Sequence, residues 1–181
     1  MVEQRDINWE LIRKQLPFER TKAQKELRIQ LWKRIDSNHD SHVTLAELDK
    51  GLKNVLHCYQ VFQCKPVIIK AFTLAKNANT KRQKHGNYYI DFTEFRLVLL
   101  YLRQYFEYFQ AFARIDIDDD RQISKNEFMK SIGKIELWTG PIKRPKKEFE
   151  LLDTNRDDLI DFDEFCVWAV KKNLDLHDDD D

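Results

Sequence analysis

The chain has 181 residues, of which 42% are hydrophobic and 12% aromatic, enough apolar material for the core of one or two domains. Only four glycines and four prolines are present, which favours an all-α fold over one built from strands and tight turns. Residues 1–90 hold 17 Lys and Arg against 9 Asp and Glu, a net charge of +8, whereas residues 91–181 hold 14 against 22, a net charge of −8. The acidic half would repel nucleic acid, which we exclude as a partner because the chain also has no base-reading motif.

The first predicted element is a short amphipathic helix within the N-terminal segment 1–18. Ile7, Leu11 and Ile12 are expected on one face of this helix, and Pro17 ends it. The helix is short and carries charges of both signs, so we expect it to pack on the rest of the protein. Membrane contact is peripheral at most.

Residues 19–102 are predicted to form a first pair of helix–loop–helix units. The first loop has the spacing of a twelve-residue Ca²⁺ site, with oxygen donors at positions 1, 3, 5 and 9, a backbone carbonyl at 7 and a Glu at 12. The residues at these six positions are Asp36, Asn38, Asp40, His42, Thr44 and Glu47. A Thr followed three residues later by Glu is also a helix cap that needs no metal. The clustered acidic residues before it carry the prediction, because they repel one another unless a cation lies between them.

The second loop begins at residue 83 and lacks this chemistry. Its first three ligand positions are occupied by Gln83, His85 and Asn87. None of these is a carboxylate, and several basic residues precede them, so we expect no Ca²⁺ in this loop. Its predicted role is structural, with Ile90 pairing against Val43 of the first loop through a short strand.

The segment from Phe92 to Ile115 contains neither Gly nor Pro and is apolar on almost every side, which predicts one long buried helix. Arg96, Arg103, Glu107 and Arg114 interrupt its apolar run, so it has too few consecutive apolar residues to cross a bilayer. We expect the two pairs of units to pack on one another or on a partner.

Residues 103–174 are predicted to form a second pair of units, with two further loops of the same spacing. The ligand positions of the third loop are Asp116, Asp118, Asp120, Gln122, Ser124 and Glu127. Those of the fourth loop are Asp153, Asn155, Asp157, Leu159, Asp161 and Glu164. Position 6, where a sharp turn favours Gly, is Ser41, Arg121 or Asp158 in the three good loops. We therefore expect weaker sites than those of a high-affinity buffer, with the fourth loop binding best.

Residues 175–181 are predicted to form a solvated acidic tail. The chain has three cysteines, an odd number without CxxC spacing, and it shows no secretory signal. These features indicate a reducing, intracellular compartment.

Three signatures add to the loops and are not required by the Ca²⁺ spacing. They are Trp9-Glu10-x-Ile12-Arg13-x-x-x-Pro17, Arg28-Ile29-x-Leu31, and Asp91-Phe92-x-Glu94-Phe95-Arg96-Leu97-x-Leu99-x-Tyr101. With them the chain resembles the EF-hand superfamily, and most closely the flagellar calcium-binding proteins, or calflagins. The resemblance implies four EF-hand units in two pairs with an extra N-terminal helix, a place in the cilium or flagellum, and Ca²⁺ sensing. Calflagins carry a lipid anchor on an N-terminal Gly, whereas this chain begins Met1-Val2-Glu3, so lipid anchoring is not expected.

The ligand spacing and the family resemblance leave two functions open. The first is a Ca²⁺ sensor or adaptor of the cilium or flagellum that binds a protein partner, with tubulin or another axonemal protein as the candidate. The second is a structural adaptor bound to axonemal microtubules regardless of Ca²⁺, which the presence of only two methionines favours slightly. We do not expect an enzyme, because no zinc-binding His spacing, phosphate loop or nucleophile elbow is present.

Overall fold

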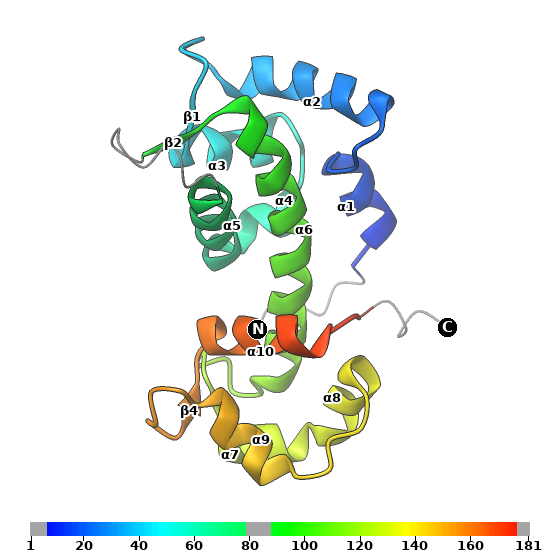
Figure 1. Cartoon of the computed structure of the whole chain (residues 1–181), viewed down its shortest axis with the longest axis vertical. Coiled ribbons are helices and arrows are strands. Elements are labelled where there is room, and N and C mark those ends of the chain that lie inside the picture. Colours follow the sequence, from blue (N-terminus) through cyan, green and yellow to red (C-terminus); the bar gives the residue numbers. More distant parts are fainter. Residues whose placement is uncertain (1–6, 79–87, 177–181) are drawn as a thin grey trace. The chain divides into compact units, whose positions relative to one another are not determined.

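The computed structural model describes residues 7–78 and 88–176, which form two compact units divided within one helix at residues 106 and 107. The N-terminal unit contains α1 (Trp9–Gln15), α2 (Lys22–Ile35), β1 (Val43–Thr44), α3 (Leu45–Asn54), α4 (Tyr59–Gln63), α5 (Lys65–Asn77), β2 (Tyr89–Ile90) and the first part of α6 (Phe92–Ile115) (Figure 1). The C-terminal unit contains the end of α6, β3 (Ile123–Ser124), α7 (Lys125–Lys130), α8 (Ile132–Thr139), α9 (Pro145–Leu152), β4 (Leu159–Ile160) and α10 (Phe162–Lys172). The all-α prediction is confirmed. The first three ligand positions of the second loop lie outside the described residues.

Each unit joins its two loops through a two-stranded antiparallel sheet. Val43 pairs with Ile90 in the N-terminal unit, and Ile123 pairs with Ile160 in the C-terminal unit. All four side chains are fully buried. The contact between Val43 and Ile90 is the one predicted from the sequence, and each sheet links the two loops of its unit.

Helix α1 docks on the N-terminal unit through one narrow apolar face. Ile12 and Leu16 are buried, and the Trp9 ring meets Phe106 of α6 edge-on at a centroid distance of 5.7 Å. Leu11 is 47% exposed, so its predicted place on the buried face is wrong. The buried face follows the i, i+4 spacing of Ile12 and Leu16, and Leu11 falls outside it.

Two arginines hold the segment that connects α1 to α2. The buried Arg28 donates from Nη1 to the carbonyl oxygens of Pro17 at 2.9 Å and Glu19 at 2.7 Å. Arg96 donates to the carbonyl oxygen of Phe18 at 3.3 Å. Burial, together with the nearby charge of Arg96, lowers the pKa of Arg28. Two of the sequence signatures thus fix the extra helix to the first EF-hand pair, a task that metal binding itself does not impose.

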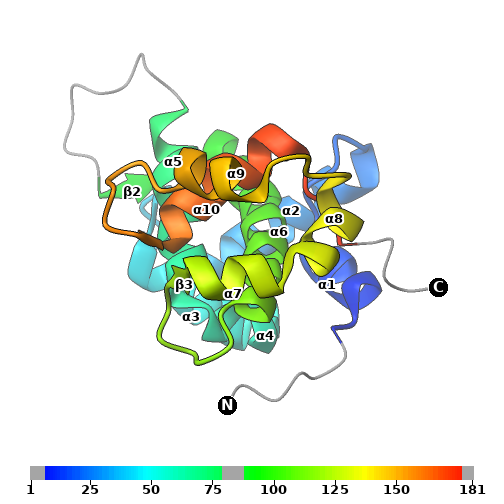
Figure 2. The ribbon, with the colours of Figure 1, turned by 90° about the horizontal axis from the view of Figure 1, so that it is seen from below.

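The core of the C-terminal unit is a cluster of aromatic rings. Phe128 of α7 lies 5.7 Å from Phe149 of α9, and Phe112 of α6 lies 5.6 Å from Phe165 of α10, measured between ring centroids. Both contacts are edge-on, the arrangement that aromatic pairs prefer. In Figure 2 the third loop, before β3, and the fourth loop, after α9, lie on the same side of this unit.

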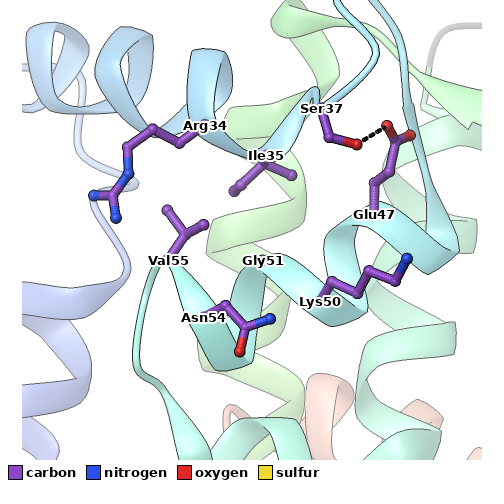
Figure 3. Close-up of a pocket in the computed structure, with 8 residues that line it drawn as sticks. All are labelled: Arg34, Ile35, Ser37, Glu47, Lys50, Gly51, Asn54 and Val55. Carbon is purple, nitrogen blue, oxygen red and sulfur yellow. Dashed lines mark hydrogen bonds between the residues drawn. The ribbon is translucent and has the colours of Figure 1, made fainter.

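In the N-terminal unit, α2 and α3 approach closely at Gly51. A Cβ atom at this position would lie 2.8 Å from Cγ1 of Ile35, the last residue of α2 (Figure 3). The inner face of α2 consists of Arg28, Trp32 and Ile35, whereas Leu27 is 47% exposed. An arginine therefore occupies part of the face that α2 turns to the core.

The three cysteines are buried and form no disulfide. Burial raises the pKa of Cys58 to about 11 and of Cys64 to about 12, so both thiols are protonated at neutral pH.

Within the part of the chain that the structure describes, no helix is both long and apolar enough to span a bilayer.

Replacing Gly51 with Ala tests the close approach of α2 and α3. The added methyl group meets a stiff β-branched side chain, and such overpacking costs about 1–3 kcal/mol, more than the helix propensity gain of up to about 1 kcal/mol. Urea unfolding is expected to show a lower free energy of unfolding for G51A. The control is G133A in α8, where a Cβ meets nothing within 4 Å and stability is expected to rise. A stabilised G51A protein would contradict this packing.

Candidate metal centres

The metal-ligand loops connect the helices of each EF-hand unit, and their last four residues begin the exiting helix. Thr44, Ser124 and Asp161 cap α3, α7 and α10, and in each case the Glu three residues later returns a hydrogen bond to the cap backbone. Asp91 and Glu94 exchange the same hydrogen bonds at the start of α6, in the unit whose loop lacks carboxylate ligands. The cap therefore forms without any ligand set, and positions 9 and 12 alone do not identify a metal site.

The Asp at position 1 fixes the backbone of each loop from inside. Asp36, Asp116 and Asp153 are 5%, 8% and 8% exposed. In every loop one carboxylate oxygen accepts a hydrogen bond from the backbone N–H of position 6, at 3.1, 3.0 and 3.1 Å in chain order. This contact closes the loop on itself.

Positions 3 and 5 continue the same network in each loop. In the fourth loop the N–H of Asp157 donates to Oδ1 of Asn155 at 3.0 Å, and the N–H of Leu159 donates to Oδ1 of Asp157 at 3.0 Å. The first loop repeats both contacts with Asn38, Asp40 and His42. The side chains that would bind metal thus also shape the turn.

The Glu at position 12 bridges the two ends of each loop. One oxygen of Glu127 accepts from the N–H of Ile117 at 2.8 Å, and the other accepts from the N–H of Ser124 at 2.8 Å. Burial raises the pKa of Glu127, but the hydrogen bonds from Ser124, Ile117 and Asp118 outweigh it, so the pKa is lowered overall. Burial likewise opposes the hydrogen bonds that lower the pKa of Glu47 and Glu164. All three Glu residues favour the ionised form that a cation needs.

Ser37 and Thr154, at position 2, were not predicted to take part. The Ser37 hydroxyl donates to Glu47 at 3.1 Å (Figure 3). The Thr154 hydroxyl donates to Glu164 at 2.8 Å. A hydroxyl residue directly after the first Asp was the signal in the sequence. It adds a donor that orients the Glu side chain.

Position 6 takes the left-handed conformation that its usual Gly would supply. The φ angles are 67° at Ser41, 71° at Arg121 and 64° at Asp158. Position 4 is left-handed too, at His39, Asp119 and Arg156, with φ of 58°, 61° and 63°. The turn at position 6 was expected from the ligand spacing, whereas the left-handed position 4 was not, and each of these three loops therefore holds two strained residues.

The residues present fit a hard divalent cation. Oδ1 of Asp36 is buried and has no hydrogen-bond partner among the described residues, an arrangement that is costly unless a ligand completes it. Ligand oxygens of Asp116, Asp118 and Asp120 lie within 4.8 Å of one another. Burial, followed by the charge of Asp120, raises the pKa of Asp116, as expected where carboxylates crowd together.

The other predicted ligands divide by position. Position 7 is His42, Gln122 or Leu159, whose predicted contribution is the backbone carbonyl. The His42 ring meets the Tyr89 ring edge-on at a centroid distance of 4.0 Å. Ca²⁺ prefers such a mixture of carboxylate, amide and carbonyl oxygens. The assignment of individual ligands stays a prediction.

Comparison with known proteins places these loops in a family context. The FCaBP EF-hand domain model matches residues 12–102, and the EF-hand domain pair model matches residues 106–169. The flagellar calcium-binding protein of Trypanosoma cruzi is 31% identical over 96% of this chain and 83% of its own length. Flagellar calcium-binding protein TB-17 of Trypanosoma brucei brucei is 31% identical over 98% of this chain and 77% of its own length.

A solved structure of a homologue of programmed cell death 6 protein from Leishmania major is a more distant match. It has a TM-score of 0.39 and 14% identity, over 79% of this chain and 70% of that chain. A likeness of this size says nothing about function. The sequence relatives carry the family assignment.

Replacing Arg121 with Gly tests the cost of the strained turn in the third loop. Gly removes strain of roughly 1–2 kcal/mol at positive φ, so the metal-free protein should unfold at higher urea concentration. Removal of the nearby positive charge should also tighten Ca²⁺ binding by about 3- to 10-fold at low salt, measured by competition with a chelating dye. R121K keeps the charge and the strain and should change neither quantity. Equal behaviour of R121G and R121K would contradict the prediction.

Proposed function

This chain belongs to the family of flagellar calcium-binding proteins of the EF-hand type, and from that membership we propose that it acts as a Ca²⁺ sensor for a protein partner in the flagellum. The observation that carries the proposal is the cluster of carboxylates in the third loop. There Asp116, Asp118 and Asp120 crowd together while Glu127 closes the loop. A divalent cation between these oxygens would replace repulsion with attraction.

The position of the ligands connects metal binding to helix movement. Asp116 directly follows the last residue of α6, and Glu127 lies in the first turn of α7. A cation held by both residues acts on the angle between these helices, which is how EF-hand sensors expose apolar surface to a target. The β3–β4 contact would pass this change to the fourth loop, because Ile123 and Ile160 are paired across the two strands.

The two units are unequal in ligand chemistry, which supports a division of roles. The C-terminal unit has two loops with complete ligand sets, at residues 116–127 and 153–164. The N-terminal unit has one, at residues 36–47, whose partner strand comes from the loop without carboxylates. We assign the stronger response to the C-terminal unit.

A protein partner of acidic character fits the charge distribution. Residues 1–90 carry a net charge of +8, and tubulin or another axonemal protein with carboxylate-rich segments would complement it. The same charge serves the second candidate function, a Ca²⁺-independent adaptor on axonemal microtubules. The low methionine content favours the adaptor, because adaptable sensor surfaces are rich in Met.

Replacing Glu127 or Glu164 with Gln, separately, tests the metal assignment. Gln keeps the size of the side chain but lacks the negative charge and bidentate geometry at position 12, so each variant should lose one bound Ca²⁺ in calorimetric titration. Glu150 is exposed on α9 outside the loops, and E150Q should keep the full number of ions. Full stoichiometry in both loop variants would refute the assignment.

Sedimentation with purified microtubules separates the two candidate functions. A sensor should bind in a manner that depends on Ca²⁺, and E127Q together with E164Q should abolish that dependence. An adaptor should bind equally with Ca²⁺ and with chelator. The absence of binding under both conditions would remove microtubules as the partner of this chain.

A further inference from the structure

The residues that follow α10 turn back onto the C-terminal unit. Asn173 has φ of 52° and ψ of 45°, the left-handed conformation that ends helices, and its N–H bonds to the carbonyl oxygens of Ala169 and Val170. After this reversal Leu174 and Leu176 are 5% and 2% exposed. We name residues 174–176 the C-terminal segment. Residues 175 and 176 were expected to belong to a solvated tail, but Leu176 is buried.

The backbone N–H groups of residues 174, 175 and 176 each donate a hydrogen bond to a different helix. The N–H of Leu174 bonds to the carbonyl of Ala169 in α10 at 3.0 Å, and that of Asp175 bonds to the carbonyl of Trp138 in α8 at 3.2 Å. The N–H of Leu176 bonds to Oε1 of Glu107 in α6 at 2.8 Å. We name the surface formed at Ala169, Trp138 and Glu107 the docking surface.

The character of Glu107 indicates that this surface is built to receive a peptide chain. Glu107 is 6% exposed on a helix that is otherwise apolar in this region, and a buried carboxylate is costly unless hydrogen-bonded. Its bond to Leu176 uses a backbone N–H, a donor that any extended segment can supply. The segment that the surface receives also carries two apolar side chains, Leu174 and Leu176, on either side of the polar Asp175.

The C-terminal segment is a small part of the core of this unit. It follows the last described helix, so its release would unfold no helix among the described residues. Burial of its two leucines favours the docked position, and the conformational entropy lost in ordering its backbone opposes this gain. A partner segment of the same chemistry can therefore compete with it.

We propose that the docking surface binds an extended apolar-polar-apolar segment of a protein partner, and that residues 174–176 are its internal competitor. The proposal deepens the sensor function, on which it rests, by naming the surface that the partner meets. The helices that carry the surface also carry the metal loops: α6 ends next to Asp116, and α10 begins between Asp161 and Glu164. Metal binding thus acts on the surface from both sides.

A peptide added to the full-length protein tests this competition. The probe is a fluorescent peptide with the sequence of residues 171–178, and the variant carries L174A and L176A together. The variant should bind the peptide at least tenfold more tightly than the wild type, by fluorescence anisotropy, because its internal competitor is weakened. L137A, which changes a leucine of α8 that is 67% exposed, should behave as wild type. A peptide with both leucines replaced by Asp should bind neither protein.

Equal peptide binding by wild type and variant, or no binding by a variant with native circular dichroism, would overturn the proposal. Amide hydrogen exchange of the wild type gives a second test that needs no variant. The Leu176 N–H should exchange through local opening, faster than the amides within α10, and exchange only on global unfolding would also overturn it. Bound Ca²⁺ is counted in the same samples, so a protein that binds Ca²⁺ but no peptide contradicts this inference and leaves the sensor function standing.

Discussion

Repulsion between carboxylates held close together is the constraint on which the C-terminal unit depends. One carboxylate oxygen each of Asp116, Asp118 and Asp120 lies within 4.8 Å of the others. Backbone N–H groups of the loop donate hydrogen bonds to Asp116, but these donors carry no net charge to offset that of the carboxylates. The same N–H groups keep the ligands in place, because Asp116 accepts from position 6 while Glu127 accepts from positions 2 and 9. The loop is thus shaped in advance for an ion whose charge completes it.

This local arrangement reaches the helices by two routes. The Glu at position 12 belongs to the first turn of the exiting helix, so any change in its ligation acts on that helix directly. The paired strands connect the loops, with Ile123 against Ile160 in one unit and Val43 against Ile90 in the other. In the N-terminal unit Arg28 also anchors the segment that connects α1 to α2, a contact separate from the metal loop.

Features that depend on spacing along the chain could be predicted from the sequence, and features that depend on tertiary packing could not. Strand contacts and helix caps follow from loop positions, as at Val43, and the structure confirms them. The predicted buried face of α1 was partly wrong, because Leu11 is as apolar as the residues that are buried in its place. The role of Ser37 was missed because a hydroxyl at position 2 is not required by the ligand pattern. The C-terminal segment was missed since its acidic surroundings in the sequence conceal the burial of Leu176.

Equilibrium dialysis of the purified chain against radioactive calcium tests the central claim most directly, because it counts ions without assuming any structural response. The account predicts three bound ions per chain at millimolar Ca²⁺, one for each loop with a complete ligand set. A protein that retains no more calcium than a metal-stripped albumin would contradict it. The crowded carboxylates would then need another explanation.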